Sequence, residues 1–187
     1  MYARTRFAIS IAAAAAIGFA AAGVVRAQSP APALDDATIV AIFDETNTAD
    51  IEASGLAASK ASHPDVRELG RMFAHDHTAV RQQGRDLAKK LGVTPTPPKP
   101  DQGAKDQAAA MNKLRALKGE EFDRAYLAHE VAFHQAVIDA VTQTLVPAIK
   151  NAEVKAFVLK VVPAFQGHLA AAKKLAEKYG APASASR

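Results

Sequence analysis

Apolar residues recur at helical spacing along four long segments of this chain, and each segment carries one ionisable residue inside its apolar stripe. The segments cover residues 35–61, 64–91, 120–150 and 152–180. The four ionisable residues are Asp50, His77, His134 and His168. Burying such groups is costly unless they are hydrogen-bonded, paired or bound to a metal. The pattern therefore predicts a four-helix bundle with a polar centre in its core.

The positions of these residues relative to the helix turns predict that they lie at one depth in the bundle. Asp50 lies twelve residues before the first turn at Ser62, and His77 lies fourteen residues after His63. His134 and His168 lie seventeen residues on either side of the second turn at Asn151. We therefore expect the members of each pair to face each other at mid-bundle. Glu130, four residues before His134, shares a helix face with it.

The connections predict how the four helices are joined. The first two form an antiparallel hairpin through Ser62-His63-Pro64, and the last two form another near Asn151. Residues 92–103 include four prolines and should be extended, at about 3.1 Å per residue. This segment could span about 35 Å as a crossover along the bundle; the alternative is an ordinary surface loop. A short extra helix over residues 105–118 should follow.

The N-terminal residues are typical of a secretory signal. Arg4 and Arg6 precede an apolar, alanine-rich run, and Val25-Arg26-Ala27 offers a cleavage pattern. We predict a signal peptide over 1–27, with a retained membrane anchor as the alternative. A disordered spacer (28–34), the bundle domain (35–180) and a disordered tail (181–187) should follow.

Export changes how the charge of the chain is interpreted. The whole chain carries a net charge of +4, and the predicted signal holds three arginines and no acid, so the mature protein would carry about +1. This charge gives no support for nucleic-acid binding. We expect a periplasmic protein with no stable membrane insertion after signal removal, and self-association stays open.

Several stretches resemble a bacterial exported ferritin-like family of unknown function, the domain-of-unknown-function family four-one-four-two, often labelled "predicted outer membrane protein". The resembling stretches are Asp50-Ile51-Glu52, Met72 to Thr78, Phe122 to Tyr126, His134-Gln135 and Val162 to Leu169. The resemblance covers roughly residues 36–179 and implies an all-α, ferritin-like four-helix bundle without an established activity. Family members usually have Glu at the position of Asp50, so we expect the shorter side chain to reach less far into the centre.

The candidate ligands indicate one metal ion rather than a di-iron pair. A ferritin-like di-iron centre uses four Glu and two His, with Glu-x-x-His on two helices. The chain lacks that spacing before each of its three stripe histidines. The candidate ligands for a single Zn, Cu or Fe ion are Asp50, His77, Glu130, His134 and His168. The alternative is a metal-free hydrogen-bonded network.

The sequence carries few signals of catalysis. It contains no cysteine, no Gly-x-Ser-x-Gly element and no glycine-rich phosphate loop. We therefore favour a non-enzymatic periplasmic helical-bundle protein with a role in metal handling or envelope stress protection. The alternatives are a mononuclear metalloenzyme and a protein interaction module with a metal-free polar core.

Overall fold

The regular structure of the described residues is entirely helical. The computed structural model describes residues 34–99 and 101–182. The helices are α1 (Asp36–Lys60), α2 (Pro64–Leu91), α3 (Gln102–Ala116), α4 (Gly119–Ala140), α5 (Val146–Ala148) and α6 (Ala152–Lys178), with a π-helical turn η1 (Val141–Leu145). None of these helices is long and apolar enough to cross a membrane.

Local signals in the sequence set the ends of these helices. Asp35 caps α1 by accepting the backbone N–H of Thr38 at 2.8 Å. Asn151 caps α6 through its side-chain oxygen. Pro64 occupies the first turn of α2, where its missing N–H costs nothing, and Gly92 ends that helix in the left-handed region at φ 65°.

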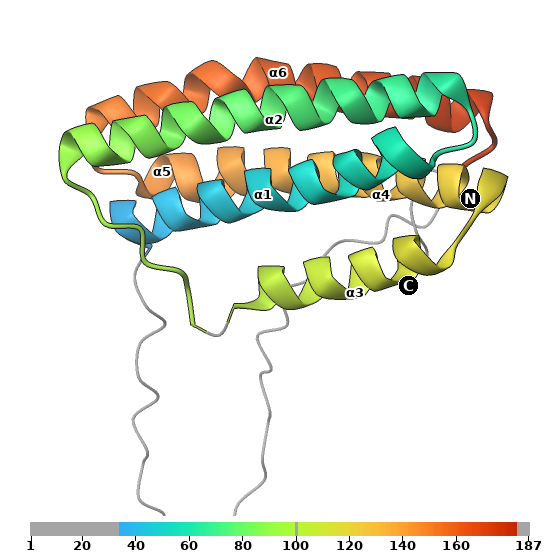
Figure 1. Cartoon of the computed structure of the whole chain (residues 1–187). Helices are drawn as coiled ribbons and strands as arrows, with labels where there is room; N and C mark the ends of the chain where they lie inside the picture. The colour runs from blue at the N-terminus through green and yellow to red at the C-terminus, as the bar shows by residue number, and fades with distance from the viewer. Residues whose placement is uncertain (1–33, 100, 183–187) are drawn as a thin grey trace, which may run out of the picture. The chain divides into compact units, whose positions relative to one another are not determined.

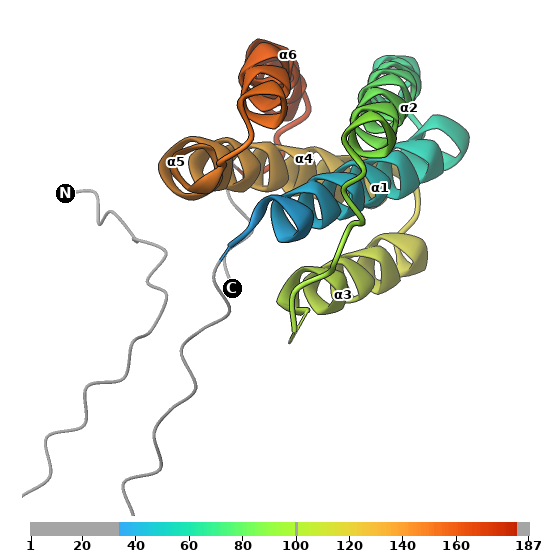
Figure 2. The same cartoon turned by 90° about the vertical axis from the view of Figure 1, so that its left-hand side faces the viewer.

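The four long helices form a ring in the order α1, α2, α6 and α4 (Figures 1 and 2). Helices α1 and α2 form one antiparallel hairpin, and α4 and α6, joined through η1 and α5, form the other. Packing is more extensive within each hairpin than between hairpins. The predicted all-α bundle of two hairpins, with a crossover and a short extra helix, is confirmed.

The crossover between the hairpins runs along the outer side of α1. Its proline-rich part binds the start of α1, where the N–H of Thr96 donates to the carbonyl of Ala37 at 3.2 Å. Helix α3 continues along α1: Gln107 donates to the carbonyl of Ala49, and Lys60 donates to carbonyls at the end of α3. The short helix predicted over residues 105–118 differs at its start, because α3 begins at Gln102. The sequence also did not predict that α3 packs along α1 from the middle of α1 to its end.

The predicted third helix over residues 120–150 is not one regular helix. Helix α4 ends at Ala140 and continues as the π-helical turn η1, in which the N–H of Val146 bonds to the carbonyl of Val141. Pro147 follows directly and cannot donate a backbone hydrogen bond to Gln143. The wider turn accommodates this loss, since π-turns place one extra residue in a helix.

Close packing of α1 and α2 depends on Gly70. A Cβ atom at this position would lie 2.7 Å from both the carbonyl oxygen of Ser54 and the backbone nitrogen of Ala58. These contacts are with backbone atoms, so α1 and α2 could not keep this spacing with a larger residue. The close approach brings the middle of α1, which carries Asp50, toward α2, which carries His77.

The turn of each hairpin is hydrogen-bonded to one carboxylate on the other hairpin. Asp123 on α4 accepts the backbone N–H groups of Ser62 and His63 and the hydroxyl of Ser62, at 2.6–3.1 Å. Asp36 on α1 accepts the backbone N–H groups of Lys150 and Asn151 at 2.9 Å. These bonds satisfy N–H groups that helix starts leave unpaired. They also fix the relative level of the two hairpins.

Several sequence predictions concern residues beyond the described part of the chain. They are the signal peptide (1–27), most of the spacer (28–33) and the end of the tail (183–187).

Candidate metal centre

Each long helix brings at least one ionisable side chain to the middle of the bundle. They are Asp50 from α1, His77 from α2, His134 from α4 and His168 from α6, with Glu130 one turn before His134. All five residues are buried, with exposed fractions between 0 and 6%. The structure thus brings together all the candidate ligands named from the sequence.

Four atoms converge at the centre of this cluster. The Nε2 atom of His77 lies 3.4 Å from Nε2 of His134 and 3.2 Å from Nδ1 of His168. Oδ2 of Asp50 lies 3.4 Å from the same His77 atom and 3.6 Å from Nε2 of His134. Two ligands of one tetrahedral zinc ion, each about 2.0–2.1 Å from the metal, are separated by about 3.3 Å. These four separations match those of neighbouring ligands around a single ion, and one ring nitrogen from each of the three histidines lies within 4.8 Å of the others.

The outer nitrogen of His77 has a hydrogen-bond acceptor that defines the tautomer of the ring. Asn47, buried on α1, donates through its side-chain nitrogen to the carbonyl of Phe43 at 2.7 Å. Its side-chain oxygen is thereby directed at His77, whose Nδ1–H donates to it at 2.9 Å. The inner Nε2 atom of His77 then carries a lone pair. Histidines that bind a metal through one ring nitrogen typically donate the N–H of the other ring nitrogen to an acceptor of this kind.

The outer nitrogens of the other two histidines also face acceptors. Nδ1–H of His134 donates to the backbone carbonyl of Glu130 at 3.1 Å, and Oε2 of Glu130 lies 3.3 Å from the same nitrogen. Nε2–H of His168 donates to Oδ2 of Asp76 at 3.1 Å. With each outer nitrogen protonated, all three inner nitrogens present lone pairs to the centre.

The buried carboxyl groups lack part of their hydrogen bonding. Oδ1 of Asp50 accepts the hydroxyl of Ser54 at 2.9 Å, and Ser54 in turn accepts the hydroxyl of Tyr126 at 3.0 Å. Oδ2 of Asp50 and both side-chain oxygens of Glu130 have no hydrogen-bond partner among the described residues. Buried polar atoms are normally paired. Oδ2 of Asp50 faces the inner nitrogens of His77 and His134, whereas Oε2 of Glu130 lies beside the outer nitrogen of His134. Oδ2 of Asp50 and the inner imidazole nitrogens fit the donor set of a divalent metal ion.

Burial sets the protonation of the centre when no metal is bound. It raises the pKa of Glu130 to about 8 and, together with the neighbouring Glu130 charge, raises the pKa of Asp50 well above its usual value. Burial, reinforced by the neighbouring histidines, lowers the pKa of His77 to about 2. Burial likewise lowers the pKa values of His134 and His168. Near neutral pH, the metal-free centre is therefore largely uncharged.

The chain matches the family model described as "Domain of unknown function (DUF4142)" over residues 22–175. The chain belongs to this family. No curated protein matches the sequence.

A solved structure described as "CopM in the Cu(II)-bound form" has a similar fold. Its TM-score is 0.59 at 14% sequence identity, and the match covers 78% of this chain and 98% of that chain. At this identity the likeness concerns the fold alone. It places this DUF4142 member among helical proteins of similar architecture.

The side chain of Asp50, shorter than the Glu expected from the family resemblance, was expected to reach less far into the centre. Its Oδ2 atom lies within 3.6 Å of two histidine nitrogens. Close packing of α1 against α2 at Gly70 and the hydrogen bond from Ser54 bring the shorter carboxylate into the cluster.

Sequence reasoning missed the residues that orient the ligands of this DUF4142 chain. Asn47 lies three residues before Asp50, so helical spacing placed it near the same face. Asp76 was given no role, although its carboxylate contacts the ring of His168. Tyr126, whose hydroxyl contacts that of Ser54, was given no role either. A search for polar residues one turn from each candidate ligand could have found Asn47 and Tyr126.

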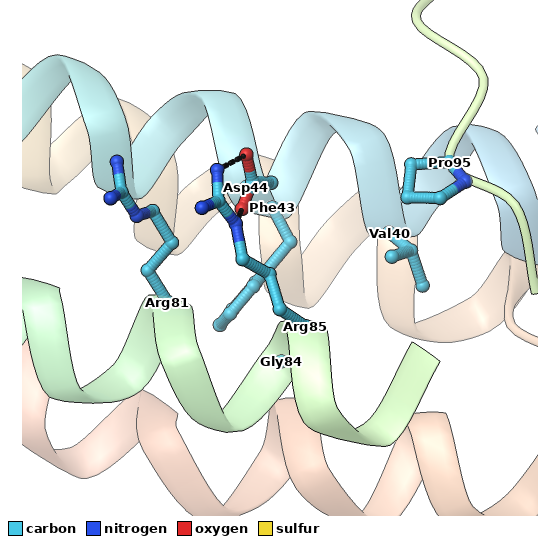
Figure 3. A pocket seen from close by; sticks show the side chains of 7 residues that line it. All are labelled: Val40, Phe43, Asp44, Arg81, Gly84, Arg85 and Pro95. Atoms are coloured by element: carbon cyan, nitrogen blue, oxygen red, sulfur yellow. Dashed lines mark hydrogen bonds and ion pairs between the residues drawn. The ribbon is translucent and has the colours of Figure 1, made fainter. Parts of the chain in front are cut away.

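A surface pocket lies apart from this centre, between α1, α2 and Pro95 of the crossover (Figure 3). It has a volume of about 200 Å³. Its two arginines already have partners: Arg85 forms a bidentate pair with Asp44, and Arg81 donates to the hydroxyl of Thr48. The pocket therefore offers no cluster of unpaired polar groups comparable to the centre.

Proposed function

We propose that this protein is a periplasmic metal-binding protein that holds one divalent transition-metal ion in its buried centre. The observation that carries the proposal is the unpartnered Oδ2 atom of Asp50, which lies beside the inner nitrogens of His77 and His134 in a buried cluster of three histidines. Asp50, His77, His134 and His168 would supply the four donors, and Glu130 would lie beside them as a fifth donor or a counter-charge. When bound, such an ion would supply the positive charge that the two buried carboxylates need.

The donor set favours copper(II) or zinc. Imidazole nitrogens suit Zn, Cu and Fe, and the centre has no thiolate or thioether donor. At sites of this kind Cu²⁺ generally binds more tightly than Zn²⁺. The likeness to a Cu(II)-bound protein motivates testing copper first, although the copper belongs to that protein.

Four protein donors favour binding over catalysis. Catalytic zinc sites usually have three protein ligands and keep one position open for water or substrate, whereas structural sites are closed by four. The proposed centre would use four protein donors, and their side chains are at most 8% exposed. We therefore infer a role in metal handling without a chemical reaction. Catalysis by the metal-loaded protein would contradict this inference.

The first experiment measures the metal content of the natural product. The protein is purified from the periplasm without chelators or affinity histidines and subjected to elemental analysis and intact mass spectrometry. We expect about one metal ion per chain and a mass that begins at Gln28. A mass that retains residues 1–27 would contradict the predicted cleavage.

A titration of metal-free protein tests the centre directly. Cu²⁺ or Zn²⁺ at about 100 times Kd should stabilise the wild type by about 2.7 kcal/mol, or about 5–10 °C in Tm. His77→Gln should abolish this gain. His75→Gln is the matched control, because His75 lies on the same helix with an exposed side chain. Equal gains in both variants would mean that the ion binds elsewhere, and no gain in the wild type would favour a metal-free network.

A further inference from the structure

The buried centre approaches the solvent at one ligand. The side chains of Asp50, His77 and His134 are 0%, 2% and 1% exposed, whereas that of His168 is 8% exposed. His168 lies on α6 and faces His77 on α2, so this edge coincides with the seam between the two hairpins. The hairpins pack less extensively against each other at this seam than the helices of each hairpin pack internally.

Asp76 lies between His168 and the solvent at this edge of the centre. Its side chain is 43% exposed, and its Oδ2 atom accepts the outer N–H of His168 at 3.1 Å. The inner Nδ1 atom of the same ring lies 3.2 Å from Nε2 of His77. One imidazole ring therefore connects a solvent-facing carboxylate to the buried donors. The other candidate carboxylates, Asp50 and Glu130, are at most 1% exposed and cannot meet an ion in solution first.

We propose that Asp76 is an outer docking site at which divalent metal ions pause on their way into and out of the centre, with His168 as the first buried donor that they meet. This inference rests on the proposed function. A carboxylate oxygen is a ligand for divalent first-row metals, and a fixed negative charge at the mouth of a site raises the rate of association. Asp76 would thus control the rate of uptake and release.

The test compares the rates of metal exchange in three proteins. Zn²⁺ uptake by metal-free protein is followed by stopped flow against a chromophoric chelator, and release is followed after adding excess chelator. Asp76→Asn keeps an oxygen that can accept the His168 hydrogen bond but removes the charge. Asp86→Asn is the control, since it removes one exposed charge from the same helix away from the centre.

We expect Asp76→Asn to slow uptake and release together by about fivefold or more, so that Kd changes less than either rate. Asp86→Asn should change both rates by less than about twofold. Wild-type uptake should slow with added salt more steeply than that of Asp76→Asn, because salt screens the docking charge. Equal unfolding transitions for the metal-free proteins will show that the variants are folded.

Two results would overturn the inference while leaving the proposed function intact. Rates for Asp76→Asn equal to those for Asp86→Asn would exclude docking at Asp76. Unchanged uptake with faster release would mean that Asp76 only holds the His168 ring in place. Absence of any Zn²⁺ or Cu²⁺ binding by the wild type would instead remove the proposed function and this inference together, and the titration of His77→Gln against His75→Gln detects that case separately.

Discussion

Asp123 and Glu130 lie seven residues apart on α4, and both are fully buried, but their surroundings differ. Asp123, near the first hairpin turn, accepts hydrogen bonds from two backbone N–H groups and a hydroxyl. Glu130, at mid-bundle, has no hydrogen-bond partner for either side-chain oxygen among the described residues. A buried acid whose oxygens are satisfied by the backbone holds the fold together. A buried acid that lies beside other candidate metal ligands and has no hydrogen-bond partner indicates a site for a cation or a proton.

The isosteric amide variants should separate these two roles most strongly. Asp123→Asn replaces an acceptor by a donor that faces N–H groups, and should lower the free energy of unfolding by about 3 kcal/mol. Glu130→Gln should instead raise the free energy of unfolding of the metal-free protein by about 2 kcal/mol near pH 6, because the folded wild type must keep a proton on Glu130 that the unfolded chain releases above pH 4.5, and glutamine needs no proton. Urea unfolding measures both. Equal losses in the free energy of unfolding would mean that both acids stabilise the fold in the same way.

The pH dependence of the metal-free protein should come from the centre. A carboxyl with a raised folded-state pKa, such as Glu130 at about 8, contributes stability that is present below its unfolded-state pKa and lost as pH rises through 8. From pH 6.5 to 8 the loss should be about 1.4 kcal/mol per pH unit for each retained proton. The histidines have lowered pKa values, so their contribution is present above about 6.5 and is lost as pH falls.

Thermal unfolding of chelator-treated protein across pH 4–9 measures this dependence. We expect the greatest stability in mildly acidic solution, between the two losses. Glu130→Gln should flatten the alkaline side, and Asp123→Asn should not. A curve for Glu130→Gln with the wild-type slope would place the retained proton elsewhere.

Energetic coupling between His134 and His168 tests whether the centre acts as one unit. Residues that share a network show interaction energies of about 0.5–3 kcal/mol, whereas distant residues add. A double-mutant cycle with His134→Ala and His168→Ala should give about 1 kcal/mol of non-additivity, because the first change already leaves its neighbours without a partner. Additive losses would show that the two histidines are independent and would weaken the proposed centre.

The smallest effect is expected for an acid paired at the surface. Asp44 binds Arg85 at the rim of the pocket in Figure 3, with side chains 26% and 49% exposed. Such pairs contribute about 0–1 kcal/mol. Asp44→Asn should therefore lower the free energy of unfolding by less than about 1 kcal/mol in urea. A loss as large as that of Asp123→Asn would mean that burial is not what separates these acids.

Counting along the sequence was sufficient to place one polar residue from each helix at a common depth. The separation of Asp50, His77, His134 and His168 from the turns depends only on the rise of a helix, which hardly varies. The four-helix arrangement followed from the same regularity. Helical periodicity therefore predicted both the bundle and the composition of its centre.

Contacts that depend on side-chain direction could not be predicted in this way. Periodicity gives the face on which Asp76 lies, but it does not identify the ring that its carboxylate meets on another helix. Asp123 was missed as a helix-capping residue for the same reason, since its partners are about 60 positions away in the chain. The π-turn before Pro147 depends on how one helix absorbs a missing hydrogen bond, which an apolar stripe does not reveal.

The origin of the four central donors from four different helices has a topological consequence. The donors are distant in the chain: His77 is 57 residues from His134 and 91 residues from His168. A bound ion would act as a reversible cross-link that closes several long loops at once, and closing long loops removes much of the entropy of the unfolded chain. Neither hairpin could then separate from the other while the ion stayed in place. Loading would therefore make separation of the two hairpins and release of the metal a single event.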